Sequence, residues 1–81
     1  MSVEVTVLYF ASLREAAGCS SERVRTDAAD LAGLYEQLRT RHRFAFARDR
    51  LSVAVADAFV AWETRLPVEG EIAFIPPVSG G

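Results

Sequence analysis

The sequence contains no lysine, one cysteine and one histidine, and these scarcities exclude several kinds of protein. With Cys19 alone the chain cannot form an internal disulfide, which is typical of a cytosolic domain. Neither Cys19 nor His42 has the neighbouring residues that a zinc site or a catalytic triad requires. We therefore expect no metal site and no catalytic apparatus made of side chains, and we interpret His42 as a cation at a helix end.

The missing lysines leave two explanations open, because all nine basic residues are arginines. An arginine-rich proteome is the simpler explanation and the one we favour. The other is that a chain with an activated C-terminus benefits from lacking amines that could attack it. A lysine amine becomes nucleophilic when its pKa falls, whereas a guanidinium stays protonated.

Long apolar runs, a secretory leader and a glycine-rich phosphate loop are also missing. We therefore expect a cytoplasmic protein without a membrane partner. The net charge of −2 disfavours a general nucleic-acid binder. Residues 39–50 hold five arginines and two phenylalanines but no RNA-binding motif, so we expect a solvated surface there and assign it no role.

The residues present predict five strands and two helices in one small domain. Period-two alternation or β-branched composition predicts strands over residues 2–10, 21–26, 51–56, 59–62 and 71–75. The highly charged second strand is expected at a sheet edge, and Asp57 with Ala58 is expected to turn the chain between the third and fourth. Pro76 and Pro77 lack the N–H groups that would continue the last strand.

Two helices are expected between these strands. Ser12 and Glu15 have capping-box spacing, and Gly18 is placed to end a short helix. Asp30 is a good N-cap for a longer helix. One apolar stripe runs along that helix and consists of Leu31, Leu34, Tyr35 and Leu38. Gly33 lies within it, and close approach of the helix to a sheet would justify the glycine.

The simplest arrangement that buries the apolar stripe of the longer helix is an α+β fold in which that helix lies across one face of a single sheet. Strand parity then places Leu8, Phe10, Phe59 and Ile75 on the face without that helix. A contiguous exposed apolar patch usually marks a partner site. We expect Phe10, Phe59 and Ile75 to form a partner interface, with coverage by loops or by the short helix as the alternative.

The tail "PPVSGG" offers a different kind of chemistry. Joining a C-terminal carboxylate to AMP converts it into an acyl donor that a sulfide or an amine can attack. Glycine suits Gly80 and Gly81 because its backbone can enter a narrow channel. Pro76 and Pro77 favour an extended exit. We therefore expect residues 1–75 to form the folded domain and residues 76–81 an extended, flexible tail with Gly81 as its reactive group.

The stretches "VLYFASLREAAG" and "EGEIAFIPPVSGG" resemble the small subunit of molybdopterin synthase, the MoaD family, and the resemblance covers the whole chain. It implies the ubiquitin-like β-grasp fold, with a mixed sheet and one main helix. It also implies that a MoeB-type activating enzyme adenylates Gly81 with ATP, and that the product becomes a C-terminal thiocarboxylate. The sulfur would then pass to a cyclic pterin precursor of molybdopterin, with no cofactor bound by this chain.

The resemblance further implies that the tail inserts into a large subunit of the MoaE type. The inserting residues would be Pro76, Pro77, Val78, Ser79 and Gly80, which precede the sulfur-bearing Gly81. Two small and two large subunits would form a heterotetramer, in which this chain is the non-catalytic sulfur donor. Three alternatives remain open: a carrier for thiamine synthesis or tRNA thiolation, a ubiquitin-like protein modifier, and an interaction module with an inert tail.

Overall fold

The computed structural model describes residues 2–67 and 70–77, which form five strands, two α-helices and one short 3₁₀ helix. The elements are β1 (Val3–Tyr9), α1 (Ala11–Ala17), β2 (Ser21–Thr26), α2 (Leu31–His42), η1 (Arg48–Arg50), β3 (Ser52–Val55), β4 (Ala58–Val60) and β5 (Glu71–Ile75). Their order confirms the sequence-based expectation, to which the structure adds η1. None of the helices described is long and apolar enough to cross a membrane.

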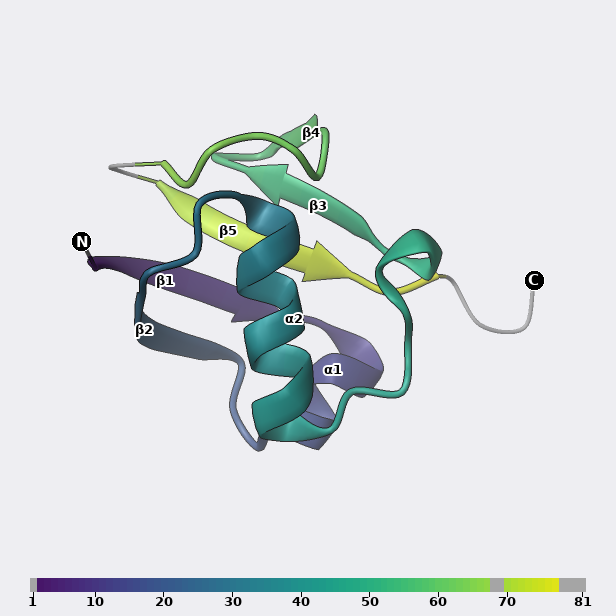
Figure 1. Ribbon diagram of the computed structural model, residues 1–81. Coiled ribbons are helices and arrows are strands. Elements are labelled where there is room, and N and C mark those ends of the chain that lie inside the picture. The colour runs from purple at the N-terminus through teal and green to yellow at the C-terminus, as the bar shows by residue number, and fades with distance from the viewer. Residues whose placement is uncertain (1, 68–69, 78–81) are drawn as a thin grey trace.

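The strands form one mixed sheet in the order β2-β1-β5-β3-β4. The central strands β1 and β5 are parallel, and the other neighbouring pairs are antiparallel. The charged strand β2 lies at an edge, as expected. Helix α2 crosses one face of the sheet (Figure 1), which confirms the α+β arrangement with one main helix.

Helix α2 follows its sequence signals closely. Asp30 caps it by accepting a hydrogen bond of 2.8 Å from the Gly33 N–H, and every residue of the apolar stripe is fully buried. The explanation offered for Gly33 is wrong. A Cβ there would lie 3.4 Å from both the Ala28 Cβ and an Asp30 carboxylate oxygen, so its nearest neighbours belong to the preceding loop and the cap and not to the sheet.

Helix α1 ends where expected and begins differently. Gly18 adopts a left-handed conformation at its C-terminus, with φ of 79°. The expected capping box is wrong, because Phe10 occupies the N-cap position and no side chain caps the helix. Ala11 has φ of 51°, so the chain turns sharply between β1 and α1. This turn leaves Phe10 exposed beside the end of β5.

The β3–β4 hairpin turns one residue earlier than expected. Ala56 and Asp57 have positive φ values of 50° and 70°, and Ala58 already belongs to β4. Two consecutive positive φ values match a type I′ turn, which suits the twist of a hairpin. The fourth strand is also shorter than expected and ends at Val60.

The core lies between α2 and the sheet and contains a cluster of aromatic rings. The Tyr35 ring centroid lies 5.2 Å from that of Phe74 and 5.6 Å from that of Trp62. Full burial of a large apolar side chain contributes about 1.5–3 kcal/mol. All of this packing lies on the sheet face that α2 covers. The opposite face has no helix α2 across it.

Candidate protein-interaction groove

The sheet face opposite α2 carries a groove with a floor of small side chains. Strand register aligns Leu8, Ala73, Ala54 and Phe59 in one row across four strands. Ala54 lies on this face and is buried beneath its larger neighbours. Two alanines between two large side chains produce a hollow of about 210 Å³.

The structure brings the three predicted interface residues together around this hollow. Phe10, Phe59 and Ile75 all line it, although they belong to three separate segments of the chain. Phe59 is 73% exposed and Phe10 is 45% exposed, whereas Ile75 is partly buried. Neither α1 nor a described loop covers these rings. Their role in binding a partner remains a prediction.

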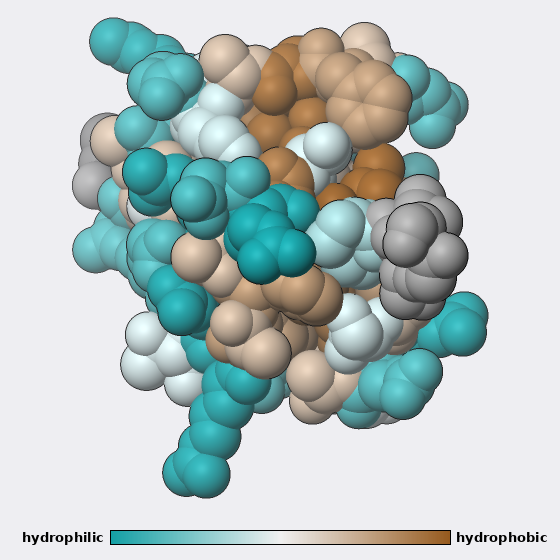
Figure 2. Space-filling view, turned by 90° about the vertical axis from the view of Figure 1, so that its right-hand side faces the viewer, coloured by the Kyte–Doolittle hydropathy of each residue, from teal (hydrophilic) through white to brown (hydrophobic). Residues whose placement is uncertain are grey.

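The most apolar surface in the side view of Figure 2 lies at the height of β3 and β4. Figure 2, seen from the right of Figure 1, shows the brown atoms gathering in the upper part of the view, at the height of these strands, while paler tan atoms also occur lower down. Polar side chains dominate the lower left. A surface divided in this way suits contact with another protein, because contiguous apolar patches commonly mark interaction sites.

One end of the groove is acidic. Asp57 in the hairpin turn and Glu71 at the start of β5 both line it. The Ala56 N–H donates a hydrogen bond of 3.1 Å to the Glu71 carbonyl, and this bond holds the turn against the start of β5. The opposite end is apolar, since Phe10 and Ile75 lie there. The groove is therefore polar at one end and apolar at the other.

A polar cluster lies on the opposite side of β1 and is centred on Glu22. The Tyr9 hydroxyl donates a hydrogen bond of 2.6 Å to the Glu22 carboxylate, and His42 Nε2 lies 3.0 Å from the same oxygen. An Arg41 guanidinium nitrogen lies 3.6 Å from the other oxygen. His42 is thus at the helix end, as expected, and it also links α2 to β2.

The surroundings of this cluster shift the pKa values of its members. Burial acts to raise the pKa of Glu22, but the hydrogen bonds from Tyr9 and His42, together with the charges of His42 and Arg41, hold it below its ordinary value. Burial, reinforced by the Glu22 carboxylate, raises the pKa of Tyr9. Glu22 is therefore ionised and Tyr9 neutral near pH 7, which makes them a stable donor–acceptor pair.

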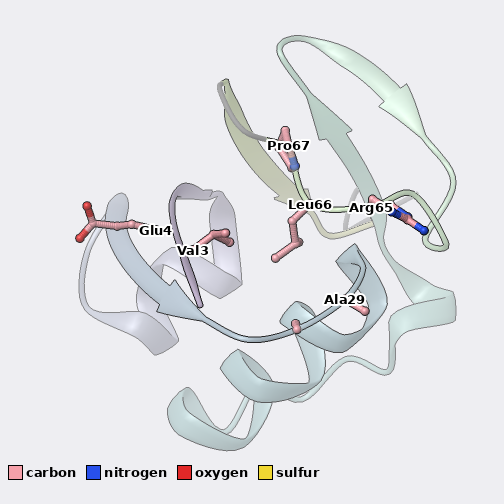
Figure 3. A pocket seen from close by; sticks show the side chains of 7 residues that line it. Val3, Glu4, Ala29, Arg65, Leu66 and Pro67 are labelled. Atoms are coloured by element: carbon pink, nitrogen blue, oxygen red, sulfur yellow. The ribbon is translucent and has the colours of Figure 1, made fainter. Parts of the chain in front are cut away.

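A second groove of about 450 Å³ lies at the other end of β1. Figure 3 shows Leu66 pointing into it, with Val3 on the far side and the Glu4 carboxylate directed away. Arg65 and Pro67 belong to the same rim. Because β1 and β5 run parallel, this groove is at the opposite end of the sheet from Phe10 and Ile75.

The structure places the first two residues of the predicted tail and no others. Pro76 is buried and Pro77 is exposed. Val78, Ser79, Gly80 and Gly81 lie outside the described residues, so their predicted roles stay predictions. Cys19 is a free thiol, as expected. Among residues 2–67 and 70–77, no group of three or more His, Cys, Asp or Glu side chains is arranged to hold a metal ion.

Sequence reasoning missed the floor and the acidic end of the groove. Ala54 and Ala73 carry no functional signature, and only the cross-strand register shows that they adjoin. Asp57 and Glu71 are separated by fourteen positions, and the hairpin brings them to one opening. The sequence did hold a signal for Asp57. It precedes Phe59 by two positions, and side chains two positions apart in an extended segment point to the same face.

Comparison with known proteins gives a consistent set of relatives. The model of the ThiS family matches residues 7–81. The molybdopterin synthase sulfur carrier subunit of Homo sapiens is 37% identical over an alignment of 83 positions, which covers 96% of this chain and 94% of that protein. The protein of the same description from Escherichia coli is 32% identical over 80 residues, covering 95% of this chain and 99% of the other.

Solved structures support the same fold. SAMP1 from Haloferax volcanii has a TM-score of 0.77 at 27% identity, over 96% of this chain and 99% of that one. A subunit in the complex of subunits 1 and 2 of the molybdopterin-converting factor from Helicobacter pylori has a TM-score of 0.63 at 25% identity. That match covers 98% of this chain and the whole of the other. These neighbours confirm the expected β-grasp fold.

Proposed function

Because this chain belongs to the ThiS family and, within it, to the sulfur carrier subunits of molybdopterin synthase, we propose that it carries sulfur for molybdopterin formation. The observation that carries the proposal is the near-full-length similarity to two curated carriers of that description. The chain would act as a donor subunit without catalytic side chains of its own. We place this role in the cytoplasm.

The reactive group in this proposal is the carboxyl carbon of Gly81. An activating enzyme of the MoeB type joins the carboxylate to AMP from ATP and releases pyrophosphate. A sulfur donor then displaces AMP and leaves a thiocarboxylate. The thiocarboxylate sulfur then bonds to the pterin precursor, and water cleaves the bond between that sulfur and the acyl carbon, which leaves the sulfur on the pterin and restores the carboxylate of Gly81. Gly80 and Gly81 suit such a tail because they allow close backbone approach to a partner's channel.

The groove supplies the second half of the proposal, a binding surface for a large subunit of the MoaE type. Phe10 and Ile75 lie at the end of the sheet where the chain continues into Pro76. A partner that covers this end is therefore placed to receive the residues that follow, from Val78 to Gly81. In the Helicobacter pylori complex, subunits 1 and 2 of the molybdopterin-converting factor bind each other. We propose the same pairing here, with two small and two large subunits in the assembly.

A second function is favoured by one observation, the similarity to SAMP1, a small archaeal modifier protein. A modifier would use the same activated Gly81 but would pass its acyl carbon to a lysine amine on another protein. The two functions diverge only after activation. Intact mass distinguishes them, since a carrier gains one sulfur in place of one oxygen and a modifier becomes joined to a second chain.

The decisive experiment removes the reactive residue. The full chain and a variant lacking Gly81 are incubated with activating enzyme, ATP and a sulfur donor, and the C-terminal peptide is analysed by mass spectrometry. We expect the full chain to gain sulfur at Gly81 and the shortened chain to gain none. The change must be localised, because oxidation of Met1 or Cys19 gives a similar mass shift.

Two controls make the result interpretable. The shortened variant should unfold at the same denaturant concentration as the full chain, because the last strand, β5, ends at Ile75, six positions before Gly81 in the sequence. Gly81→Ala should load sulfur more slowly, since a methyl group restricts the backbone and widens the tail. A shortened chain that still supported molybdopterin formation would refute the carrier function.

A further inference from the structure

We propose that Asp57 and Glu71 form an acidic lip that selects a partner segment carrying an arginine or lysine next to an apolar side chain. This inference rests on the proposed function, because the partner meant is the large subunit. The apolar side chain would enter the hollow above Ala54 and Ala73. The basic side chain would then reach the two carboxylates at the end of the groove.

The first support is the fixed position of the lip. The Ala56 N–H bonds to the Glu71 carbonyl at 3.1 Å, so the turn that carries Asp57 and the first residue of β5 are held together. Both carboxylate residues border the same hollow as Phe59 and Ala73. Charge and apolar surface are therefore presented to one partner segment at the same time.

The second support is the absence of a compensating charge within the described part of the chain. Glu4, on the same sheet face, pairs with Arg23, and Glu22 is engaged by Arg41 and His42. No ion pair joins Asp57 or Glu71 to a described residue, and no arginine lines the groove. A cation on a partner would meet carboxylates that no described side chain neutralises.

The third support is the backbone of the hairpin turn. Ala56 and Asp57 both occupy left-handed conformations, which aspartate tolerates better than alanine because its short polar side chain can bond to the local backbone. Asn-Gly is the preferred pair for a type I′ turn. This tight turn fixes the position of Asp57, which is the last turn residue before β4 and lines the groove.

Charge also decides which occupant the groove accepts. A second copy that used the same face would bring its own Asp57 and Glu71 toward this lip, and like charges at an interface are costly. A basic residue on a different chain is attracted instead. Exposed charges at the rim of an interface act mainly on the association rate and its salt dependence. We therefore expect the acidic lip to raise the association rate of the large subunit. Phe59 and its apolar neighbours are expected to determine the dissociation rate.

The test compares two doubly neutralised variants in binding to the large subunit from the same source organism. Asp57→Asn with Glu71→Gln removes the lip, and asparagine tolerates the left-handed turn. Glu15→Gln with Glu63→Gln is the matched control, because both glutamates are exposed and lie outside the groove. Association and dissociation rates are measured at about 0.1 M and about 1 M salt, where the screening lengths are about 10 Å and about 3 Å.

We expect loss of the lip to slow association about tenfold at the lower salt concentration, with little change in dissociation. The difference should nearly disappear at the higher concentration, and the matched control should remain close to the unchanged protein. Equal association rates for the two doubly neutralised variants would refute the lip. So would a homodimer, seen by sedimentation, that forms through this face.

The test also separates this inference from the proposed function. Sulfur loading of Gly81, followed by intact mass, does not depend on binding to the large subunit. If the chain loads sulfur and binds the large subunit equally well without the carboxylates of Asp57 and Glu71, the proposed function stands and the proposed acidic lip is refuted. A chain that never binds the large subunit refutes both the proposed pairing and the lip.

Discussion

Glu22 joins three segments that are distant in the sequence. Its carboxylate accepts from Tyr9 of β1 and contacts His42 and Arg41 at the end of α2, although it belongs to the edge strand β2. An edge strand has only one neighbouring strand to hold it. Side-chain bonds of this kind therefore add an attachment between β2 and the main helix, and a carboxylate acceptor strengthens them.

Replacing Tyr9 with phenylalanine isolates one of these bonds. The variant loses a hydrogen bond of 2.6 Å to a charged acceptor, and such bonds contribute about 1.5–3 kcal/mol. Tyr35→Phe is the matched control, because its hydroxyl donates to the neutral Phe46 carbonyl at 2.7 Å, worth about 0.5–1.5 kcal/mol. Urea denaturation should show the larger loss for Tyr9→Phe. Equal losses would mean that the Glu22 charge adds nothing.

The lowered pKa of Glu22 also predicts a dependence of stability on pH. A carboxylate that binds its proton less readily in the folded state contributes stability above its unfolded pKa. That contribution falls as the pH drops below the ordinary value of 4.5 and toward the lower pKa of the folded state. Glu22→Gln lacks this contribution, so it should be less stable than the natural chain at pH 7 and should approach it in acid. A stability difference that stays constant from pH 7 to acid would contradict the assigned cause.

At the scale of elements, the β3–β4 hairpin shows the largest difference between the residues' conformational preferences and the observed backbone, because Ala56 and Asp57 both have positive φ values. Strand alternation predicted both arms, but the turn was placed one residue late, because neither Ala56 nor Asp57 identifies a type I′ turn from sequence. The capping box at Ser12 and Glu15 was wrong for a related reason. A spacing rule does not reveal that Ala11, with φ of 51°, turns the chain before the helix begins.

Ala56→Asn should relieve strain in the hairpin without changing its charge. Asparagine adopts the left-handed conformation more readily than alanine, so we expect a gain of about 0.5–1 kcal/mol in the free energy of unfolding. Because Ala56 also lines the groove, the stability of the free chain, and not its binding, tests this prediction. Thermal or urea denaturation measures the gain. A loss of stability would show that the turn is not strained at this position.

Helix α2 and the edge position of β2 were predictable because each depends on a local signal. A capped helix with one apolar stripe must bury that stripe, and a strand with alternating charges is poorly suited to a sheet interior. The parallel pairing of β1 with β5 depends instead on contacts between the two ends of the chain. Local patterns cannot show such a pairing, and only the resemblance to a known family implied a mixed sheet.

At the scale of the whole molecule, one sheet face holds the core and the other holds the groove. Parity along the strands predicted that Phe10, Phe59 and Ile75 share a face, because side chains alternate regardless of tertiary context. The same parity could not reveal the alanine floor, since Ala54 and Ala73 become neighbours only through strand order. The division at residues 75 and 76 stays a prediction, and the buried Pro76 shows that packing continues past the last strand.

This separation of faces predicts that binding and stability can be changed independently. Phe59 is 73% exposed, so Phe59→Ala should barely alter the free energy of unfolding. Aromatic residues near the centre of an interface typically cost about 2 kcal/mol or more when truncated, which is more than tenfold in affinity. Calorimetric titration with the large subunit should show that loss, mainly through faster dissociation.

Phe74→Ala provides the opposite case, since Phe74 belongs to the same sheet but points into the core and is fully buried. Its truncation should cost about 3–5 kcal/mol of stability. Ile75→Ala, one position further along β5, should resemble Phe59→Ala more than Phe74→Ala, with a small stability cost from its partial burial. If Phe59→Ala and Ile75→Ala both bind the large subunit as tightly as the natural chain while remaining folded, the groove is not the interface. The large subunit would then have to recognise the chain through another surface, and the groove at Val3 and Leu66 would be the next to test.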